Sequence, residues 1–321
     1  MIDYKKKPKA DLHVHLNGLV SNHVFKKLLQ PYKGELPEWF NIDNDMTLNR
    51  NVSSLTEYLK PWYGFKLLPR NEKEFEIMVN SAIENLSLDN VVYAEIRNSP
   101  FNIASLFSSN LENVLNLLCD KFQESSEIYK IDARLIVSLS RYKLTFEKAH
   151  ALFDAIKKVN RPDIIVGIDI SGNEDEAIDN SIANLVKKAK DNIGIGVTIH
   201  AGETGKIENI EWAINECNAD RISHACALPM DSKLAETIVE KDICVECCIF
   251  SNIFSGAVFK ADRHPVKYFL DNQIPFVICS DNPSVHNKTL TDEYNLFIEL
   301  TKNSNYLEKM FSVAKDYSFG G

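Results

Sequence analysis

The sequence lacks two features, a long hydrophobic run and an excess of positive charge. Among its 321 residues, no apolar stretch approaches the roughly 18 residues that a membrane-spanning helix needs. The basic start, MIDYKKKPKADLHV, is not followed by the apolar segment of a secretory leader. The formal net charge of -9 argues against broad binding to DNA or to an anionic membrane. A small anionic ligand held by a few local donors remains compatible with this charge.

Cysteine is present but lacks the spacing of a disulfide framework. The seven cysteines are an odd number, and two of them, Cys247 and Cys248, are adjacent. Free thiols in a reducing compartment are the simplest interpretation, and buried packing is the expected role of the adjacent pair. We therefore expect a cytoplasmic protein.

Apolar runs that resemble buried strands alternate with helical patterns along the chain. Several of these runs are near-continuous in Val and Ile, which is typical of parallel strands covered on both faces. The eight runs span residues 11–16, 91–97, 132–140, 164–172, 196–203, 221–225, 243–250 and 275–282. Helical patterns lie between them, for example over residues 173–192 and 231–242. This alternation predicts an α/β fold, a (β/α)8 TIM barrel that residues 1–321 form as a single domain.

One long excursion interrupts the alternation, at residues 17–85 between the first and second strands. We predict a helical insertion here, because residues 53–68, SSLTEYLKPWYGFKLL, have a helical pattern. A long insertion after a barrel strand usually shapes or covers the mouth of the active site. We therefore expect Trp62 and Phe65 to contact a substrate. The alternative is that these aromatic side chains pack the insertion's own core.

Residues that can bind a metal ion stand at the ends of the predicted strands. His13 and His15 are one residue apart in KADLHVHLNG, so in a strand they point to the same face. His200 ends the fifth strand and Asp281 ends the eighth, and active sites of this fold form at those ends. A lone histidine on an apolar strand is more often a core residue. Three imidazoles and a carboxylate together suit Zn²⁺ with one position open for water.

Further polar residues lie on the neighbouring strand ends. Glu203 follows His200 in IHAGE, and His224 lies in RISHA at the end of the sixth strand. Glu174, Asp292 and Glu293 stand beside these motifs, where they have the positions of helix N-terminal residues. We expect the latter three to act through helix capping and the helix dipole.

From about residue 8 to about residue 295 the chain resembles the adenosine/AMP deaminase family of metal-dependent amidohydrolases. The matching stretches, in order, are PKADLHVHLNG, YAEIRNSP, VGIDISGNE, IHAGE, RISHA, SNIF and SDNP…LTDEY. The zinc signature of the cytidine-deaminase type, H-x-E…P-C-x-x-C, is missing from the sequence. The resemblance implies a hydrolytic deaminase with one zinc ion per chain, held by His13, His15, His200 and Asp281.

The resemblance also assigns roles to three further residues. It implies that Glu203 donates a proton to purine N1 and that His224 orients the attacking water and helps to deprotonate it. The backbone N–H of Gly172 would meet purine N3. Glu203 must be protonated to donate, so we predict an environment that raises the pKa of its carboxyl group.

Asn17 is a departure from adenosine deaminases proper, which usually carry Asp at this position. The HLNG form resembles the branch that acts on adenosine 5′-monophosphates, including N6-methylated ones. An aspartate would repel a phosphate, whereas the asparagine amide can donate to it. The alternative is a neutral exchange that still binds a hydroxyl group. The sequence does not rank the cations that could bind a phosphate, which are Lys66, Arg97, Arg141 and Lys143.

Asn282 is a second departure, because the family usually has Asp here and that Asp donates to purine N7. An asparagine carries an NH2 donor at every pH and could serve the same contact. The alternatives are a different base or a weakened enzyme. We predict zinc-dependent deamination of a 6-aminopurine nucleotide, AMP or dAMP, to IMP or dIMP and ammonia. An adenosine or deoxyadenosine deaminase, and a catalytically silent ligand-binding barrel within a complex, are the alternative functions. The sequence does not determine the oligomeric state or a partner protein.

Overall fold

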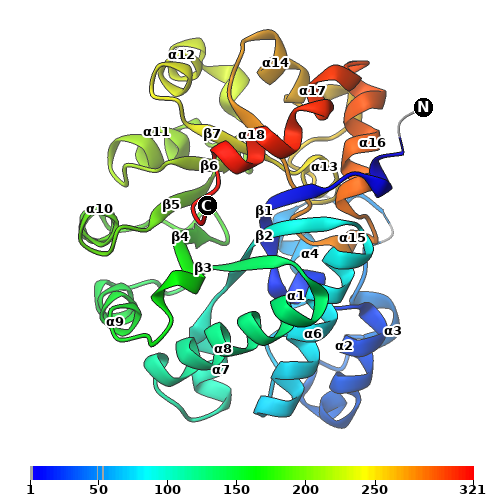
Figure 1. Cartoon of the computed structure of the whole chain (residues 1–321), viewed down its shortest axis with the longest axis vertical. Coiled ribbons are helices and arrows are strands. Elements are labelled where there is room, and N and C mark those ends of the chain that lie inside the picture. Colours follow the sequence, from blue (N-terminus) through cyan, green and yellow to red (C-terminus); the bar gives the residue numbers. More distant parts are fainter. Residues whose placement is uncertain (1–2, 49, 53) are drawn as a thin grey trace.

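A barrel of eight parallel strands forms the centre of the molecule (Figure 1). The computed structural model describes residues 3–48, 50–52 and 54–321. The strands are β1 (Lys9–His15), β2 (Val91–Asn98), β3 (Asp132–Ser140), β4 (Ile165–Ser171), β5 (Gly196–Ala201), β6 (Arg221–His224), β7 (Cys244–Cys247) and β8 (Phe276–Ile278). Each pairs in parallel with the next in sequence order. The predicted (β/α)8 fold is confirmed.

The seam between β8 and β1 is closed by backbone bonds of predicted metal ligands. The N–H of His15 donates to the carbonyl of Asp281, and the N–H of Asp281 donates to the carbonyl of His13, each over 2.9 Å. Asp281 also forms an isolated parallel bridge with Val14. Closing the barrel therefore sets the relative positions of residues that are far apart in the sequence.

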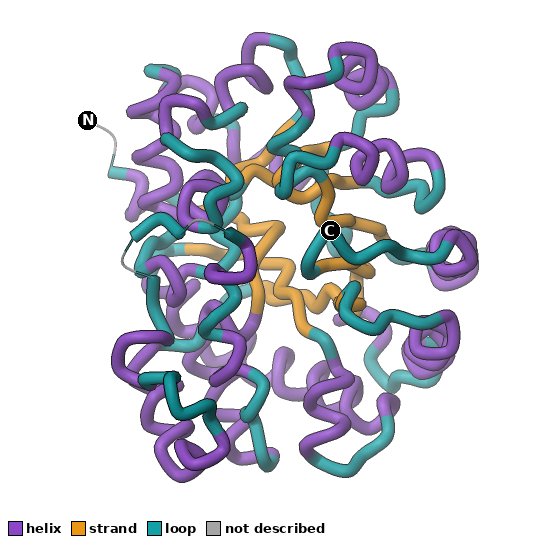
Figure 2. Tube along the Cα trace, turned by 180° about the vertical axis from the view of Figure 1, so that it is seen from behind, coloured by secondary structure: helices purple, strands orange, loops and turns teal. Residues whose placement is uncertain are grey.

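A layer of helices surrounds the strands (Figure 2). The longer helices are α6 (Glu72–Leu88), α8 (Leu111–Tyr129), α9 (Phe146–Ile156), α10 (Asn180–Ile193), α11 (Ile207–Asn215), α12 (Ser232–Glu240) and α16 (Leu290–Thr301). The shorter ones are α7 (Pro100–Leu106), α13 (Ile249–Phe254), α14 (Val266–Asp271), α15 (Pro283–His286), α17 (Ser304–Glu308) and α18 (Met310–Asp316). Within the described part of the chain, no helix combines the length and the apolar character that crossing a membrane would need.

The helix predicted over residues 173–192 begins later than expected. Asp179 caps α10, and its side chain accepts a hydrogen bond from the N–H of Ser181. A capping carboxylate satisfies an N–H group that has no partner within the helix, so the helix starts behind it. The preceding residues form a loop, which places Glu174 outside any helix.

The insertion between β1 and β2 is helical, as predicted, but its helices are short. They are α1 (Leu16–Leu19), α2 (Asn22–Leu29), α3 (Ile42–Asp45), α4 (Leu55–Tyr58) and α5 (Trp62–Phe65), followed by α6. The stretch over residues 53–68 forms two helices instead of one, with Pro61 between them; Ser53 lies outside the described residues. Phe65 packs inside the insertion, with ring centroids 4.7 Å from Phe25 and 5.2 Å from Trp62.

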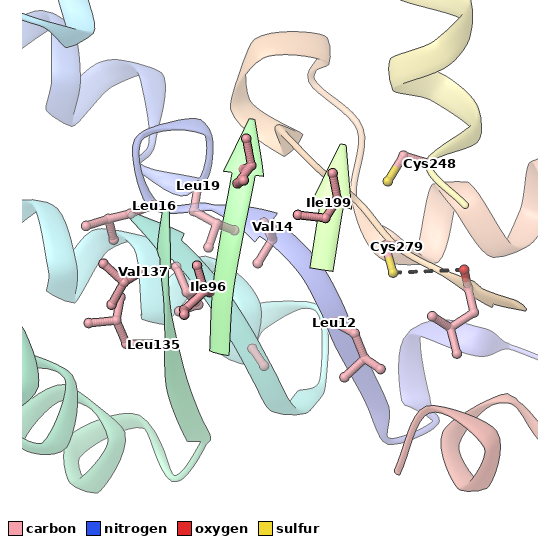
Figure 3. Close-up of a cluster of buried hydrophobic side chains, with 14 of the residues drawn as sticks. Leu12, Val14, Leu16, Leu19, Ile96, Leu135, Val137, Ile199, Cys248 and Cys279 are labelled. Carbon is pink, nitrogen blue, oxygen red and sulfur yellow. Dashed lines mark hydrogen bonds between the residues drawn. The ribbon is translucent and has the colours of Figure 1, made fainter. Parts of the chain in front are cut away.

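Apolar side chains from the strands fill the space between the barrel and its helices (Figure 3). Leu12 and Val14 of β1 are completely buried and alternate with His13 and His15 along the strand. Because successive side chains point to opposite faces, packing of the leucine and valine outward turns both histidines into the barrel. The expected free thiols are confirmed, since all seven cysteines are unpaired and all but Cys226 are buried.

Candidate active site

The four predicted metal ligands meet at the C-terminal end of the barrel. The imidazole centroids of His13 and His200 lie 4.8 Å apart, and those of His15 and His200 lie 5.4 Å apart. Nε2 of His13 and Nε2 of His15 each lie 3.3 Å from Oδ1 of Asp281. Ligand atoms of the three histidines lie within 4.8 Å of one another. Strands β1, β5 and β8 thus bring together residues separated by more than half of the sequence.

Two buried carboxylates that the sequence analysis missed orient the histidines. Nδ1 of His13 donates to Glu246 of β7 over 2.8 Å, and Nδ1 of His200 donates to Asp169 of β4 over 2.8 Å. Burial alone would raise the pKa of Glu246, but two buried arginines outweigh it and hold that pKa well below its usual range. The proton of each imidazole is therefore on Nδ1, and the lone pair of Nε2 faces the cluster.

The donor set fits a zinc ion. Nε2 of His13 is buried and has no hydrogen-bond partner among the described residues. A buried nitrogen without a partner is costly unless a ligand or an ion satisfies it. Three imidazole nitrogens and one carboxylate, with no thiolate among them, are the ligands of a catalytic zinc site with an open position.

Glu203 follows β5 in an environment that favours its protonated form. Its Oε1 accepts a hydrogen bond from Oγ of Ser255 over 3.0 Å, and its Oε2 lies 3.9 Å from Nε2 of His224. Burial, the carboxylate of Glu174 and that of Asp281 raise the pKa of Glu203 to about 8. The predicted increase in this pKa is thus present, and the carboxyl group holds a proton at neutral pH.

Glu174 does not have the capping role that the sequence suggested. Its carboxylate lies in the loop after β4 and accepts the backbone N–H groups of Gly202 over 2.8 Å and of Glu203 over 2.7 Å. The expectation for Glu293 is also wrong in detail, because its side chain accepts N–H groups at the start of α13, not at the start of its own helix. The expectation for Asp292 is confirmed, since it forms a capping box with the residue that caps α16. Glu174 therefore fixes the backbone that carries Glu203.

Two residues of the site have left-handed backbone conformations. The φ angle is +70° at His224 and +57° at Asp281. For residues other than glycine this conformation costs about 1–3 kcal/mol each, and it persists where the surrounding structure holds it. Gly172, just after β4, has φ of +106°, which side-chain-bearing residues rarely adopt. His224 and Asp281 thus have this conformation at strand ends that carry the predicted site, while other described residues, such as Asn90 and Lys302, have it elsewhere in the chain.

The amide of Asn282 is already engaged within the protein. Its NH2 group donates to Oδ1 of Asp281 over 2.7 Å and to the hydroxyl of Tyr58 over 3.2 Å. The Tyr58 hydroxyl also lies 2.8 Å from Nε2 of His286 and 3.1 Å from Oγ of Ser251. The buried residue that reaches this site from the insertion is therefore Tyr58, which the sequence analysis did not single out.

The other predicted substrate-binding residues surround this centre less closely. Asn17 is half-buried in α1, next to Gly18, and a Cβ atom on Gly18 would come within 2.2 Å of Oδ1 of Asn282. Trp62 is half-buried and Phe65 is buried among aromatic side chains of the insertion. Contact of Trp62 and Phe65 with a substrate stays a prediction.

The four candidate cations for a phosphate differ in accessibility. Arg97 is completely buried in the barrel, 2.5 Å from Glu246 and 3.8 Å from Asp169, so it is not available to a phosphate. Arg141 is also buried, and it donates to the carbonyl of His200 over 3.1 Å. The exposed cations among the four are Lys66 and Lys143. These two lysines are therefore the solvent-accessible members of the four.

The chain is similar to known proteins in its sequence and in its fold. A model of the adenosine deaminase family matches residues 8–310. An adenosine deaminase of Clostridium botulinum is 28% identical over 299 residues, which cover 92% of this chain and 88% of that protein. The N6-methyl-AMP deaminase of Arabidopsis thaliana superposes with a TM-score of 0.85 at 25% identity, covering 99% of this chain and 94% of that one. A zinc-bound amidohydrolase of Burkholderia ambifaria superposes with a TM-score of 0.84 at 20% identity, covering 98% and 86%.

Proposed function

This chain belongs to the adenosine deaminase family, whose members are hydrolases that deaminate adenosine-type purines, and on that premise we propose that its substrate is a 5′-nucleotide. AMP or dAMP would be converted to IMP or dIMP and ammonia. The observation that carries the proposal is a carboxyl group held in its acid form, Glu203, beside a cluster of cation ligands.

We assign zinc to the cluster formed by His13, His15, His200 and Asp281. When bound, zinc supplies Lewis-acid activation of water at neutral pH. Glu203 holds the proton that purine N1 receives as water adds at C6, which neutralises the charge that develops on the ring. The backbone N–H of Gly172 binds purine N3, and the imidazole of His224 contacts the attacking oxygen.

Two observations support a substrate with a 5′-phosphate. One is the presence of Asn17, and the other is the similarity to a nucleotide deaminase. Asn17 is neutral and half-buried. An aspartate at this position would repel a phosphate dianion by several kcal/mol, because two unit charges 4 Å apart near a protein surface interact by ~4 kcal/mol. The similar Arabidopsis protein is named for its action on N6-methyl-AMP. Lys66 and Lys143, the exposed cations of the original four, are the residues we assign to the phosphate.

A free nucleoside is the second candidate, because the curated relatives are named adenosine deaminases. The two substrates are separated by measuring kcat/KM for AMP, dAMP, N6-methyl-AMP, adenosine and deoxyadenosine from the absorbance change on 6-oxopurine formation. We expect the monophosphates to exceed the nucleosides by at least tenfold. In Asn17→Asp this ratio should fall by about tenfold or more, since about 1.4 kcal/mol of repulsion corresponds to tenfold. A wild-type preference for nucleosides would overturn the assignment.

A further inference from the structure

A row of buried hydrogen bonds leads from the start of α14 to His224. The backbone N–H of Val266 donates to Nδ1 of His264 over 3.1 Å. Nε2 of His264 lies 3.1 Å from Oδ1 of Asn252, and Nδ2 of Asn252 lies 3.0 Å from Nδ1 of His224. All three side chains are buried, with exposed fractions of 5% or less. Asn252 lies in SNIF, one of the stretches that carry the family resemblance, but neither Asn252 nor His264 is among the residues to which that resemblance assigned a role.

The direction of every bond in this row follows from its first member. A peptide N–H can only donate, so Nδ1 of His264 accepts and carries no proton. Burial lowers the pKa of His264 to about 3, so the ring is neutral and its one proton is on Nε2. That proton is donated to the carbonyl oxygen of Asn252. The NH2 group of Asn252 then faces His224 and donates to it.

His224 consequently has the opposite tautomer to its histidine neighbours. Its Nδ1 accepts from Asn252, so its proton is on Nε2, the nitrogen that lies 3.9 Å from Oε2 of Glu203. His13 and His200, whose rings lie 5.1 and 5.0 Å from that of His224, donate through Nδ1 to carboxylates and expose a lone pair. The amide partner thus makes His224 a hydrogen-bond donor toward the site, whereas the carboxylate partners make His13 and His200 cation ligands.

We propose that Asn252 and His264 are positioning residues that hold His224 as an Nε2–H donor aimed at the oxygen that adds to the purine ring. The inference rests on the proposed deamination and corrects the role suggested for His224, because a nitrogen that already carries a proton does not take one from water. A fixed donor stabilises the negative charge that the attacking oxygen acquires as it gives up its proton. That proton passes to the Glu203 carboxylate, which has given its own proton to N1, and then to the amino group that leaves as ammonia. Loss of one such donor costs about 10²–10³ in kcat in other enzymes.

The tautomer is measured directly by NMR of the full chain with ¹⁵N-labelled histidine. Resonances of His224 are assigned by their loss in a His224→Gln variant. We expect Nδ1 of His224 to have the shift of an unprotonated nitrogen and Nε2 that of a protonated one. In Asn252→Asp both side-chain oxygens accept, so the proton should move to Nδ1 and kcat/KM should fall by about 10²–10³. A wild-type His224 protonated on Nδ1 would overturn the inference.

Two substitutions of His264 separate positioning from packing. The side-chain amide introduced by His264→Gln can donate to Asn252 as the imidazole does, whereas His264→Phe fills similar space without a donor. We expect His264→Gln to keep the His224 tautomer and to recover most of the activity that His264→Phe loses, at matched melting temperatures. Equal losses in both variants with an unchanged tautomer would contradict the proposal. If wild-type protein shows the expected tautomer but deaminates none of the purines tested, the proposed function fails and the hydrogen-bond assignment stands.

Discussion

Both ends of the barrel bury charged side chains, but these side chains have different kinds of partner at the two ends. At the N-terminal end, Arg221 donates to Glu95 over 2.5 Å and to the carbonyl of Tyr317 over 2.9 Å. The ring of Phe319 covers the guanidinium at 3.6 Å, and its backbone N–H donates to the second oxygen of Glu95. At the C-terminal end, imidazole nitrogens and carboxylates of the kind that bind a metal ion converge within 4.8 Å of one another. Removing one partner of a buried ion pair destabilises a fold, whereas a cluster of ligand-type groups with shifted pKa values indicates a functional site.

A ladder of ion pairs joins these ends through the barrel. Arg221 lies 2.7 Å from Oε1 of Glu246, Arg97 lies 2.5 Å from Oε2 of the same carboxylate, and that oxygen also accepts from His13. Arg97 continues the ladder to Asp169, 3.8 Å away. Arg97 and Arg221 keep Glu246 ionised, and an ionised carboxylate requires the proton of His13 to be on Nδ1. The buried arginines that extend from the N-terminal end therefore help to fix the tautomer of His13 at the C-terminal end.

Removing the metal should have the largest effect on activity, because it takes away the cation that the clustered histidines and Asp281 would hold. We expect dialysis against a chelator to abolish measurable deamination of purines, and stoichiometric Zn²⁺ to restore it. Zinc at about 100 times its dissociation constant should also stabilise the fold by about 2.7 kcal/mol, seen as a higher melting temperature. Full activity in protein shown by elemental analysis to be free of metal would contradict the assignment.

Glu203→Gln should have the next largest effect, since the amide is almost isosteric but has no acidic proton to give to N1. We expect kcat to fall by about 10²–10⁴ while zinc content stays stoichiometric. Glu208→Gln, the same exchange on an exposed carboxylate of α11, is the matched control and should change neither quantity. Turnover at the wild-type rate in Glu203→Gln would remove this residue from the chemistry.

The pH dependence should reveal the same carboxyl group. Glu203 donates only when protonated and its pKa is raised to about 8, so kcat/KM should fall about tenfold per pH unit above that value. The folded state also binds this proton between the ordinary pKa of Glu, about 4.3, and about 8, where the unfolded chain does not. Stability should therefore decrease as pH rises through that window, and less so in Glu203→Gln. Parallel pH–stability curves for the two proteins would contradict this pKa.

The sequence predicted residues whose role depends on the strand they end, and missed those whose role depends on a distant partner. His13 and His200 were found because a barrel brings strand ends together whatever the details of packing. The same rule does not predict which backbone N–H groups Glu174 contacts. The stretch NEDE that contains Glu174 is as typical of a helix start as of the loop that it forms. Asp169 is a polar residue within an apolar strand, a signal that was present and not used. Tyr58 reaches the site because of how the insertion folds. The insertion consists largely of short helices, whose positions the sequence pattern does not predict.

The smallest expected effect tests whether the covered end serves only the fold. Phe319→Ala removes the half-buried ring over Arg221, and partial burial of a phenylalanine side chain together with a cation–π contact stabilises by about 2 kcal/mol. We expect a lower melting temperature and a kcat/KM within about twofold of wild type, since Phe319 contacts the far end of the ladder. Phe259→Ala, at a phenylalanine that is 83% exposed, is the matched control and should leave stability unchanged. A fall in kcat/KM of folded Phe319→Ala beyond tenfold would show that the ladder transmits the packing of the covered end to His13, and the two ends would then act as one site.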